Sequence, residues 1–271
     1  MSRVRLGSVG YLNARPLVFG LQHSPQFDLR FDVPSSCADL LHGGGIDVGL
    51  IPSIEYLRHP AGARSGGEYL IAPDLAIASR GDVASVALYT TKPIEDVESI
   101  ALDVSSRTSV ALVRVLCARQ FKIKPRLASH RPDLTSMLAG CDAALLIGDN
   151  ALFQPGVARD FDKIDLGAAW TAMTGLPFVW AFWAGRPGAL TAAEVAALQE
   201  ARNAGVNQSE AIARDYFPRL PDRQRIGAKY LRDNIKYYLG PDERAGLELF
   251  YRYAAEAGVV NAPAPLCFFG E

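Results

Sequence analysis

Five short polar clusters interrupt the apolar segments of this chain, and their residue types suit the binding of a small organic anion. Serine and threonine hydroxyls, free backbone N–H groups and a partial positive charge occur together where a helix begins, and all three favour a carboxylate. In open α/β sheets, ligands bind at the carboxyl ends of the strands, where helices begin. The clusters are Tyr11 with Asn13 and Arg15, Ser53 with Glu55, residues 105–109 (SSRTS), residues 148–150 (GDN) and residues 174–177 (TGLP).

Each cluster also has a purely structural interpretation. Ser53, residues 105–109, and Asp149 with Asn150 can each cap the helix that follows them, and Glu55 can serve as an ion-pair partner. Five polar residues in 105–109 exceed what one cap needs, which favours a ligand there. The aromatic residues between 170 and 183 are expected to form core and cleft wall rather than a cofactor site.

The established motifs of nucleotide binding and catalysis are missing from the sequence. It contains no G-x-x-x-x-G-K-[ST], G-x-G-x-x-G, G-x-S-x-G or H-E-x-x-H. Cys37, Cys117, Cys141 and Cys267 are scattered, without a C-x-x-C pair, which indicates reduced thiols rather than a metal site or disulfide framework. We therefore do not expect a metal enzyme.

The bulk composition is that of an ordinary globular protein. Of the 271 residues, 49% are hydrophobic, and the formal net charge is −1. This charge creates no global field that would attract nucleic acid or an anionic membrane surface. The first residues lack the apolar run and cleavage site of a signal peptide, and no apolar run approaches transmembrane length. We expect a cytoplasmic protein that binds neither nucleic acid nor membrane.

The elements that must position the clusters alternate between strand and helix, which indicates an α/β fold. Apolar segments at 4–12, 29–34 and 46–52 form one set of predicted strands, and 99–103 and 141–148 belong to a second set. The segments 75–79 and 84–90 are close enough in sequence to pair as antiparallel strands. The last third is predicted helical, with a capping box formed by Thr191 and Glu194.

The two α/β units are either independent or interleaved. In the interleaved case the chain crosses to the second unit near residue 91, at the polar stretch 91–99, and returns near residue 183. The first lobe then comprises residues 1–90 and 184–271, and the second lobe residues 91–183. Two crossings make a hinge, and the ligand lies in the cleft between the lobes.

Five segments in this order resemble the chorismate dehydratase family of menaquinone biosynthesis (the futalosine route). They are VGYLNARPL (9–17), DVGLIPSIEYL (47–57), SVALYT (85–90), SSRTSVALVRVL (105–116) and GLPFVWAFWAG (175–185). The Y-L-N-x-x-P-L element is the most specific of them. The resemblance implies a fold like the type 2 periplasmic binding proteins, with two interleaved α/β lobes, a central cleft and, in this chain, C-terminal helices.

The resemblance also implies a reaction without metal or organic cofactor. The dicarboxylate chorismate loses water to give 3-[(1-carboxyvinyl)oxy]benzoate, and the ring becomes aromatic. Our hypothesis is that the substrate's enolpyruvyl carboxylate helps to remove the ring proton while Asn13, the candidate catalytic residue, holds the ring substituents. The candidate substrate-binding residues are Tyr11, Arg15, Ser53, Ser105, Ser106, Thr108, Ser109, Asp149, Asn150, Thr174 and Gly175.

Three other functions fit the same fold. The chain can be the sister enzyme of the pathway, which forms 1,4-dihydroxy-6-naphthoate, although the Y-L-N-x-x-P-L opening favours the dehydratase. It can be a non-enzymatic protein that binds a small anion. A dehydratase of the prephenate type is a weaker third alternative.

Overall fold

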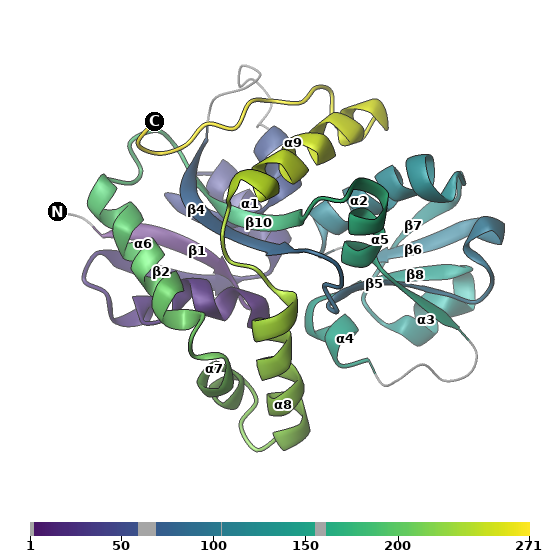
Figure 1. Cartoon of the computed structure of the whole chain (residues 1–271), viewed down its shortest axis with the longest axis horizontal. Helices are drawn as coiled ribbons and strands as arrows, with labels where there is room; N and C mark the ends of the chain where they lie inside the picture. Colours follow the sequence, from purple (N-terminus) through teal and green to yellow (C-terminus); the bar gives the residue numbers. More distant parts are fainter. Residues whose placement is uncertain (1–2, 59–68, 104, 155–160) are drawn as a thin grey trace.

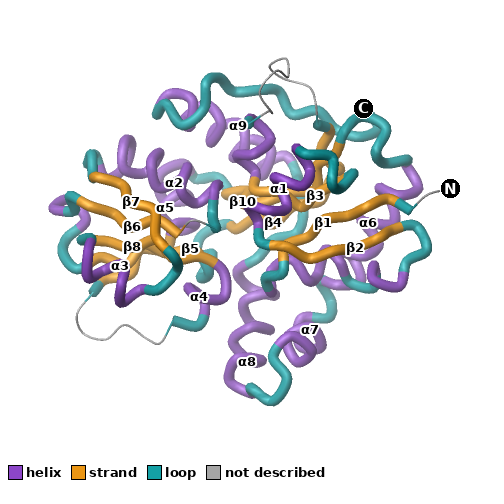
Figure 2. The backbone as a smooth tube through the Cα atoms, turned by 180° about the vertical axis from the view of Figure 1, so that it is seen from behind, coloured by secondary structure: helices purple, strands orange, loops and turns teal. Residues whose placement is uncertain are grey.

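The computed structural model describes residues 3–58, 69–103, 105–154 and 161–271, and it contains two five-stranded sheets that lie side by side (Figures 1 and 2). The first sheet has the order β2-β1-β3-β10-β4 and the second the order β7-β6-β8-β5-β9. Within the described part of the chain, no helix is both long and apolar enough to cross a membrane.

The first sheet is mixed. Its strands are β2 (Phe27–Asp32), β1 (Val4–Val9), β3 (Val48–Pro52), β10 (Phe178–Gly185) and β4 (Leu70–Ser79). β1 is parallel to β2 and β3, whereas β10 runs antiparallel between β3 and β4. β3 is buried along its whole length, as its continuous apolar sequence predicts for a strand covered on both faces. The helix α1 (Pro34–His42) packs against β1 and β3.

The second sheet repeats this arrangement. Its strands are β7 (Arg126–His130), β6 (Ser99–Asp103), β8 (Ala143–Ile147), β5 (Val86–Thr90) and β9 (Asp162–Asp165). β6 is parallel to β7 and β8, and β5 runs antiparallel between β8 and β9. Figure 1 shows α2 (Arg107–Leu116) and α5 (Leu166–Thr174) above this sheet, and α3 (Leu134–Gly140) below it. The short helix α4 (Gly148–Leu152) follows β8 directly.

The chain crosses between the sheets twice, but at other places than the sequence predicts. It leaves the first sheet after Ser79 and enters the second with β5, and it returns between Thr174 and the start of β10. Residues 86–90 therefore lie in the second sheet and residues 178–183 in the first, which is the reverse of what the boundaries near 91 and 183 predict. The expected pairing of 75–79 with 84–90 is also wrong, since β4 pairs with β10 and β5 with β8 and β9. A fully buried strand has the same local pattern in either sheet, so the pattern does not show its partners.

The C-terminal third is helical, as predicted, and it packs on the first sheet and on the helix α2 above the second sheet. It consists of α6 (Ala192–Gly205), α7 (Ser209–Tyr216), α8 (Pro221–Lys229) with a π-helical turn (Tyr230–Asn234), and α9 (Pro241–Glu256). The capping box of Thr191 and Glu194 is present at the start of α6. In Figure 1, α9 lies over β10 and reaches α2, and both contacts exist in the structure. Arg119, beyond the end of α2, pairs with Glu256 of α9.

The starts of three helices have specific local causes. Pro16 lies inside a 3₁₀ helix (Leu12–Val18). The helix α1 begins at Pro34, with Val33 in the capping position, because proline is already constrained to a helical φ. Ser53 begins a second 3₁₀ helix (Ser53–Leu57), and its hydroxyl donates to the Val179 carbonyl at 2.8 Å instead of capping the helix.

Candidate active site

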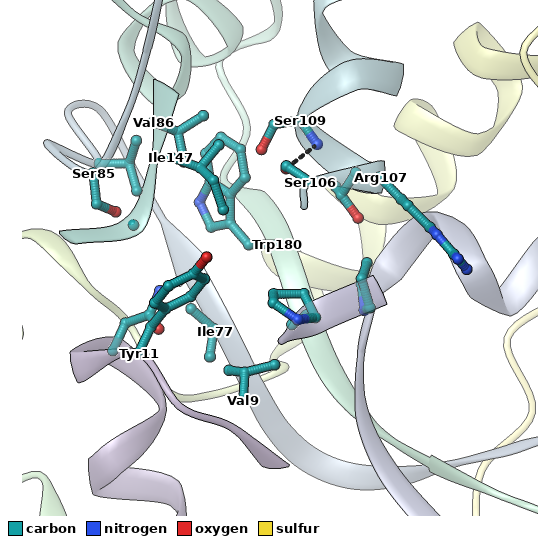
Figure 3. Close-up of a pocket in the computed structure, with 17 residues that line it drawn as sticks. Val9, Tyr11, Ile77, Ser85, Val86, Ser106, Arg107, Ser109, Ile147 and Trp180 are labelled. Carbon is teal, nitrogen blue, oxygen red and sulfur yellow. Dashed lines mark hydrogen bonds between the residues drawn. The ribbon is translucent and has the colours of Figure 1, made fainter. Parts of the chain in front are cut away.

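A pocket lies between the two sheets, and both sheets contribute to its lining (Figure 3). The carboxyl ends of four parallel strands, β1, β3, β6 and β8, are each followed by one of the predicted polar clusters. Tyr11, Asn13, Ser106, Thr108 and Ser109 from these clusters line the pocket.

The pocket walls are largely apolar. Ile77 and Trp180 come from the first sheet, and Val86 and Ile147 come from the second. The Trp180 indole N–H donates to the Ser79 hydroxyl at 3.1 Å, and this bond holds the ring in place. A flat ring bound between such walls is shielded from water.

Tyr11 reaches the pocket because its neighbour is a glycine. Gly148 begins α4 with φ +60°, and a Cβ built there lies 3.2 Å from Cε1 and Cζ of the Tyr11 ring. The Tyr11 hydroxyl is hydrogen-bonded to Ser105, and burial raises the pKa of Tyr11. Ser105 in turn donates to Asp103 Oδ1 at 2.6 Å. Ser105 therefore contacts the pocket residue Tyr11 and does not itself line the pocket.

The start of α2 supplies the donors that suit an anion. Ser106 caps the helix, since its hydroxyl accepts from the Ser109 N–H at 3.3 Å. The N–H groups of Arg107 and Thr108 in this first turn have no acceptor within the helix. Thr108 Oγ1 accepts from the Ile54 N–H at 3.3 Å, which ties the start of α2 to the first sheet's 3₁₀ helix.

Arg107 contributes its backbone to the pocket region, but Figure 3 shows its side chain pointing away from the other lining residues. Its guanidinium donates to Glu55 Oε2 at 2.8 Å and to Asp39 Oδ1 at 2.8 Å. Glu55 is only 2% exposed and also binds His42 and Arg58. Burial by itself raises the pKa of Glu55. The hydrogen bond from His42 and the charges of Arg107 and Arg58 lower it by more, so the net pKa lies below the ordinary value and the carboxylate is ionised. Its predicted alternative role as an ion-pair partner is present in the structure.

Asn13 lines the pocket and is bound to Tyr230, which the sequence analysis did not single out. Its side chain is hydrogen-bonded to the Tyr230 hydroxyl. Among the described residues, the buried Asn13 Oδ1 has no hydrogen-bond partner. The Tyr230 hydroxyl lies 2.7 Å from the hydroxyl of Ser85, which also lines the pocket. Ser85 is the first residue of SVALYT, one of the segments that resemble the family, so the sequence could have indicated a role for it. Tyr230 lies in a helical region without such a segment.

Several predicted site residues lie beside the pocket rather than in it. Arg15 lies between aromatic rings, its guanidinium carbon 4.4 Å from the Phe31 ring centre and 5.1 Å from that of Tyr216. Asp149 accepts from the Tyr216 hydroxyl at 2.7 Å, and burial raises the pKa of Asp149. Asn150 is exposed. Ser53 is fully buried and reaches the pocket only through Thr108, 3.5 Å away.

Thr174 and Gly175 form the end of α5 and lie outside the pocket. The Thr174 hydroxyl donates to the Trp170 carbonyl at 2.9 Å, within the helix. Gly175 has φ +74° and terminates the helix in the left-handed conformation. The cluster 174–177 is thus a helix terminator, because it follows a helix and not the carboxyl end of a strand.

Comparison with known sequences points to one family. A family model described as menaquinone biosynthesis matches residues 4–256. A chorismate dehydratase of Thermus thermophilus is 31% identical over 278 residues, which cover 95% of this chain and 96% of that protein.

Comparison with solved structures confirms the predicted fold class. A protein of Archaeoglobus fulgidus superposes with a TM-score of 0.72 at 17% identity, covering 95% of this chain and 98% of that one. A Candida albicans gene product with the generic periplasmic binding protein fold superposes with a TM-score of 0.59 at 11% identity, covering 99% of this chain and 97% of that one. A sulfonate-binding protein of Methylobacillus flagellatus superposes with a TM-score of 0.58 at 16% identity, covering 98% of this chain and 90% of that one. These likenesses show a two-lobed α/β fold of the periplasmic-binding-protein type.

Proposed function

The chain belongs to the menaquinone biosynthesis family, and on that premise we propose that it is a chorismate dehydratase, a hydro-lyase that converts chorismate to 3-[(1-carboxyvinyl)oxy]benzoate and water. Its 31% identical relative carries that name, which favours the dehydratase over the sister enzyme and over a non-enzymatic binding protein. We place the reaction in the cytoplasm, as expected for a biosynthetic enzyme that takes a small dicarboxylate.

The pocket chemistry supports a ring that carries anionic groups. Apolar side chains such as Ile77, Val86 and Trp180 line the pocket and suit contact with a six-membered ring. The first turn of α2 offers N–H groups and the hydroxyls of Thr108 and Ser109 to one carboxylate. A carboxylate that accepts several such donors needs no cation beside it, which agrees with an Arg107 side chain that is bound to Glu55 and Asp39.

The single observation that carries the proposal is the Asn13 amide oxygen, which is buried at the pocket and lacks a partner among the described residues. An unpaired buried acceptor costs about 1–3 kcal/mol, so a ligand that supplies a donor there gains affinity. Chorismate supplies one in the ring hydroxyl that leaves. Asn13 Oδ1 thus holds that hydroxyl beside the ring carbon whose proton is removed.

The elimination needs two positioned groups. The substrate's enolpyruvyl carboxylate takes the proton from C3, the C–H electron pair forms the new ring double bond, and the C4–O bond breaks with its pair on oxygen. The leaving oxygen takes up a proton, the enolpyruvyl carboxylic acid gives back in its place the proton that it took from C3, and water departs. Fixing the reacting groups can lower a barrier by about 7–11 kcal/mol in the best cases, and a donor to the leaving oxygen adds about 10²–10⁴-fold.

The test is to assay Asn13→Ala for aromatic product from chorismate. We expect turnover to fall by at least about 10²-fold, while the circular dichroism spectrum and melting temperature stay near those of the wild type. Asn261→Ala, at an exposed asparagine near the C-terminus, is the matched control and keeps full turnover. Wild-type turnover by Asn13→Ala contradicts the role of Asn13. A wild-type protein that forms no aromatic product from chorismate contradicts the function itself.

A further inference from the structure

We propose that Tyr230 is a positioning residue of this site, which fixes Asn13 as a hydrogen-bond acceptor and Ser85 as a donor toward the leaving hydroxyl. This inference rests on the proposed dehydration. Tyr230 lies in the π-helical turn after α8, far in sequence from both partners, and Ser85 lies at the crossing just before β5.

The three side chains form a connected chain of hydrogen bonds. The Tyr230 side chain is buried, with 3% of its surface exposed. Its hydroxyl oxygen is 2.7 Å from Ser85 Oγ and is also hydrogen-bonded to the Asn13 side chain. Asn13 and Ser85 line the pocket at the two ends of this chain, whereas Tyr230 lies behind them.

The direction of each hydrogen bond follows from the numbers of donors and acceptors. An asparagine side chain has an NH₂ donor and a carbonyl acceptor. Since Asn13 Oδ1 is the atom that lacks a partner in the described structure, the NH₂ group faces Tyr230 and donates to the phenol oxygen. The single phenol proton therefore goes to Ser85 Oγ, and the Ser85 O–H is left to donate elsewhere. Burial raises the pKa of Tyr230, so the phenol keeps its proton.

This order matches the needs of a leaving hydroxyl group. The C4 hydroxyl of the substrate can donate its proton to Asn13 Oδ1, and its oxygen can accept from the Ser85 O–H as the C–O bond breaks. If the phenol were absent, the Asn13 amide and the Ser85 hydroxyl would both be free to rotate. The two groups would then present their correct atoms only part of the time, which slows the chemical step more than it weakens binding.

The experiment compares Tyr230→Phe with Tyr237→Phe. Tyr237 is an equally buried tyrosine seven positions further on, and its hydroxyl has no hydrogen-bond partner in the described part of the chain. We expect Tyr230→Phe to lower kcat by about 10- to 100-fold. KM for chorismate, and the affinity for 3-[(1-carboxyvinyl)oxy]benzoate measured by calorimetry, should change less than about threefold, because the donors of α2 are intact. Tyr237→Phe should leave kcat and KM unchanged.

A double-mutant cycle with Ser85→Ala separates positioning from a general structural effect. In the Ser85→Ala background, Tyr230→Phe should lower kcat by a smaller factor than in the wild type, because the serine donor is already gone and only the orientation of Asn13 remains to be lost. Ser85→Ala by itself should lower kcat with KM preserved, and this measurement stands even if Tyr230→Phe does not fold. Equal kcat values for Tyr230→Phe and Tyr237→Phe, or independent effects in the cycle, would overturn the inference. A wild-type protein inactive on chorismate would instead overturn the proposed function.

Discussion

Gly148→Ala should damage the pocket through a single added methyl group. The methyl group would lie 3.2 Å from Cε1 and Cζ of Tyr11 and 3.3 Å from Cδ1. Carbon atoms prefer about 3.5–4.0 Å, so the ring must move by at least about 0.3 Å. The Gly148 N–H is bonded to the Ser85 carbonyl at 2.8 Å, which holds the backbone, and therefore the Tyr11 ring takes up most of the shift.

Two costs follow from this substitution, and they can be separated. Alanine in the left-handed conformation costs about 1–2 kcal/mol of stability. Displacement of the Tyr11 ring, a wall of the pocket, should also reduce catalysis. Since misplacing a reacting group by 1 Å can lower the rate about 10²-fold, a shift of a few tenths of an ångström should lower kcat/KM by about tenfold. Gly188→Ala is the matched control, because Gly188 has φ +80° and its added Cβ meets no described atom within 4 Å.

The assay measures urea unfolding and the rate of aromatic product formation for both variants. We expect both proteins to lose about 1–2 kcal/mol of stability, and only Gly148→Ala to lose kcat/KM. If the two variants have the same kcat/KM at equal folded concentration, then contact between Gly148 and Tyr11 does not shape the site.

Three further predictions concern stability. Since the folded-state pKa of Glu55 is lowered, its carboxylate stabilises the fold above the unfolded pKa of about 4.3, and this stabilisation is lost as the pH falls through the folded-state pKa. Glu55→Gln should therefore lower the free energy of unfolding, measured in urea titrations, more at pH 7 than at pH 4. A loss of stability that is the same at both pH values contradicts this. Tyr216→Phe removes the bond to the Asp149 carboxylate and should cost about 1.5–3 kcal/mol by the same method, whereas an unchanged midpoint would show that the bond contributes little. Gly246→Ala places a methyl group 2.2 Å from the Pro177 carbonyl oxygen, so its melting temperature should fall by more than 5 °C, and a wild-type value refutes this packing.

The local sequence determined the elements and the positions of the polar clusters. Continuous apolar runs marked β3 and β8, and Thr191 with Glu194 marked the start of α6, because strand burial and helix capping depend on neighbouring residues. The clusters at the ends of β6 and β8 could be predicted to meet, since the carboxyl ends of parallel strands lie at one edge of a sheet. The cluster after β1 belongs to the other sheet, and only the packing of the two lobes brings it to the same pocket. The motif segments also indicated the family and hence the two-lobed fold.

Only the tertiary structure decided which side chains face the pocket and which bind to each other. Arg15 and Thr174 have residue types that suit an anion, yet Arg15 lies against aromatic rings and Thr174 bonds within its own helix. Tyr230 meets Ser85 across 145 positions of sequence. A local pattern reports whether a residue is buried and in which kind of element, whereas the hydrogen-bond partner of a buried hydroxyl is set by how distant elements pack together.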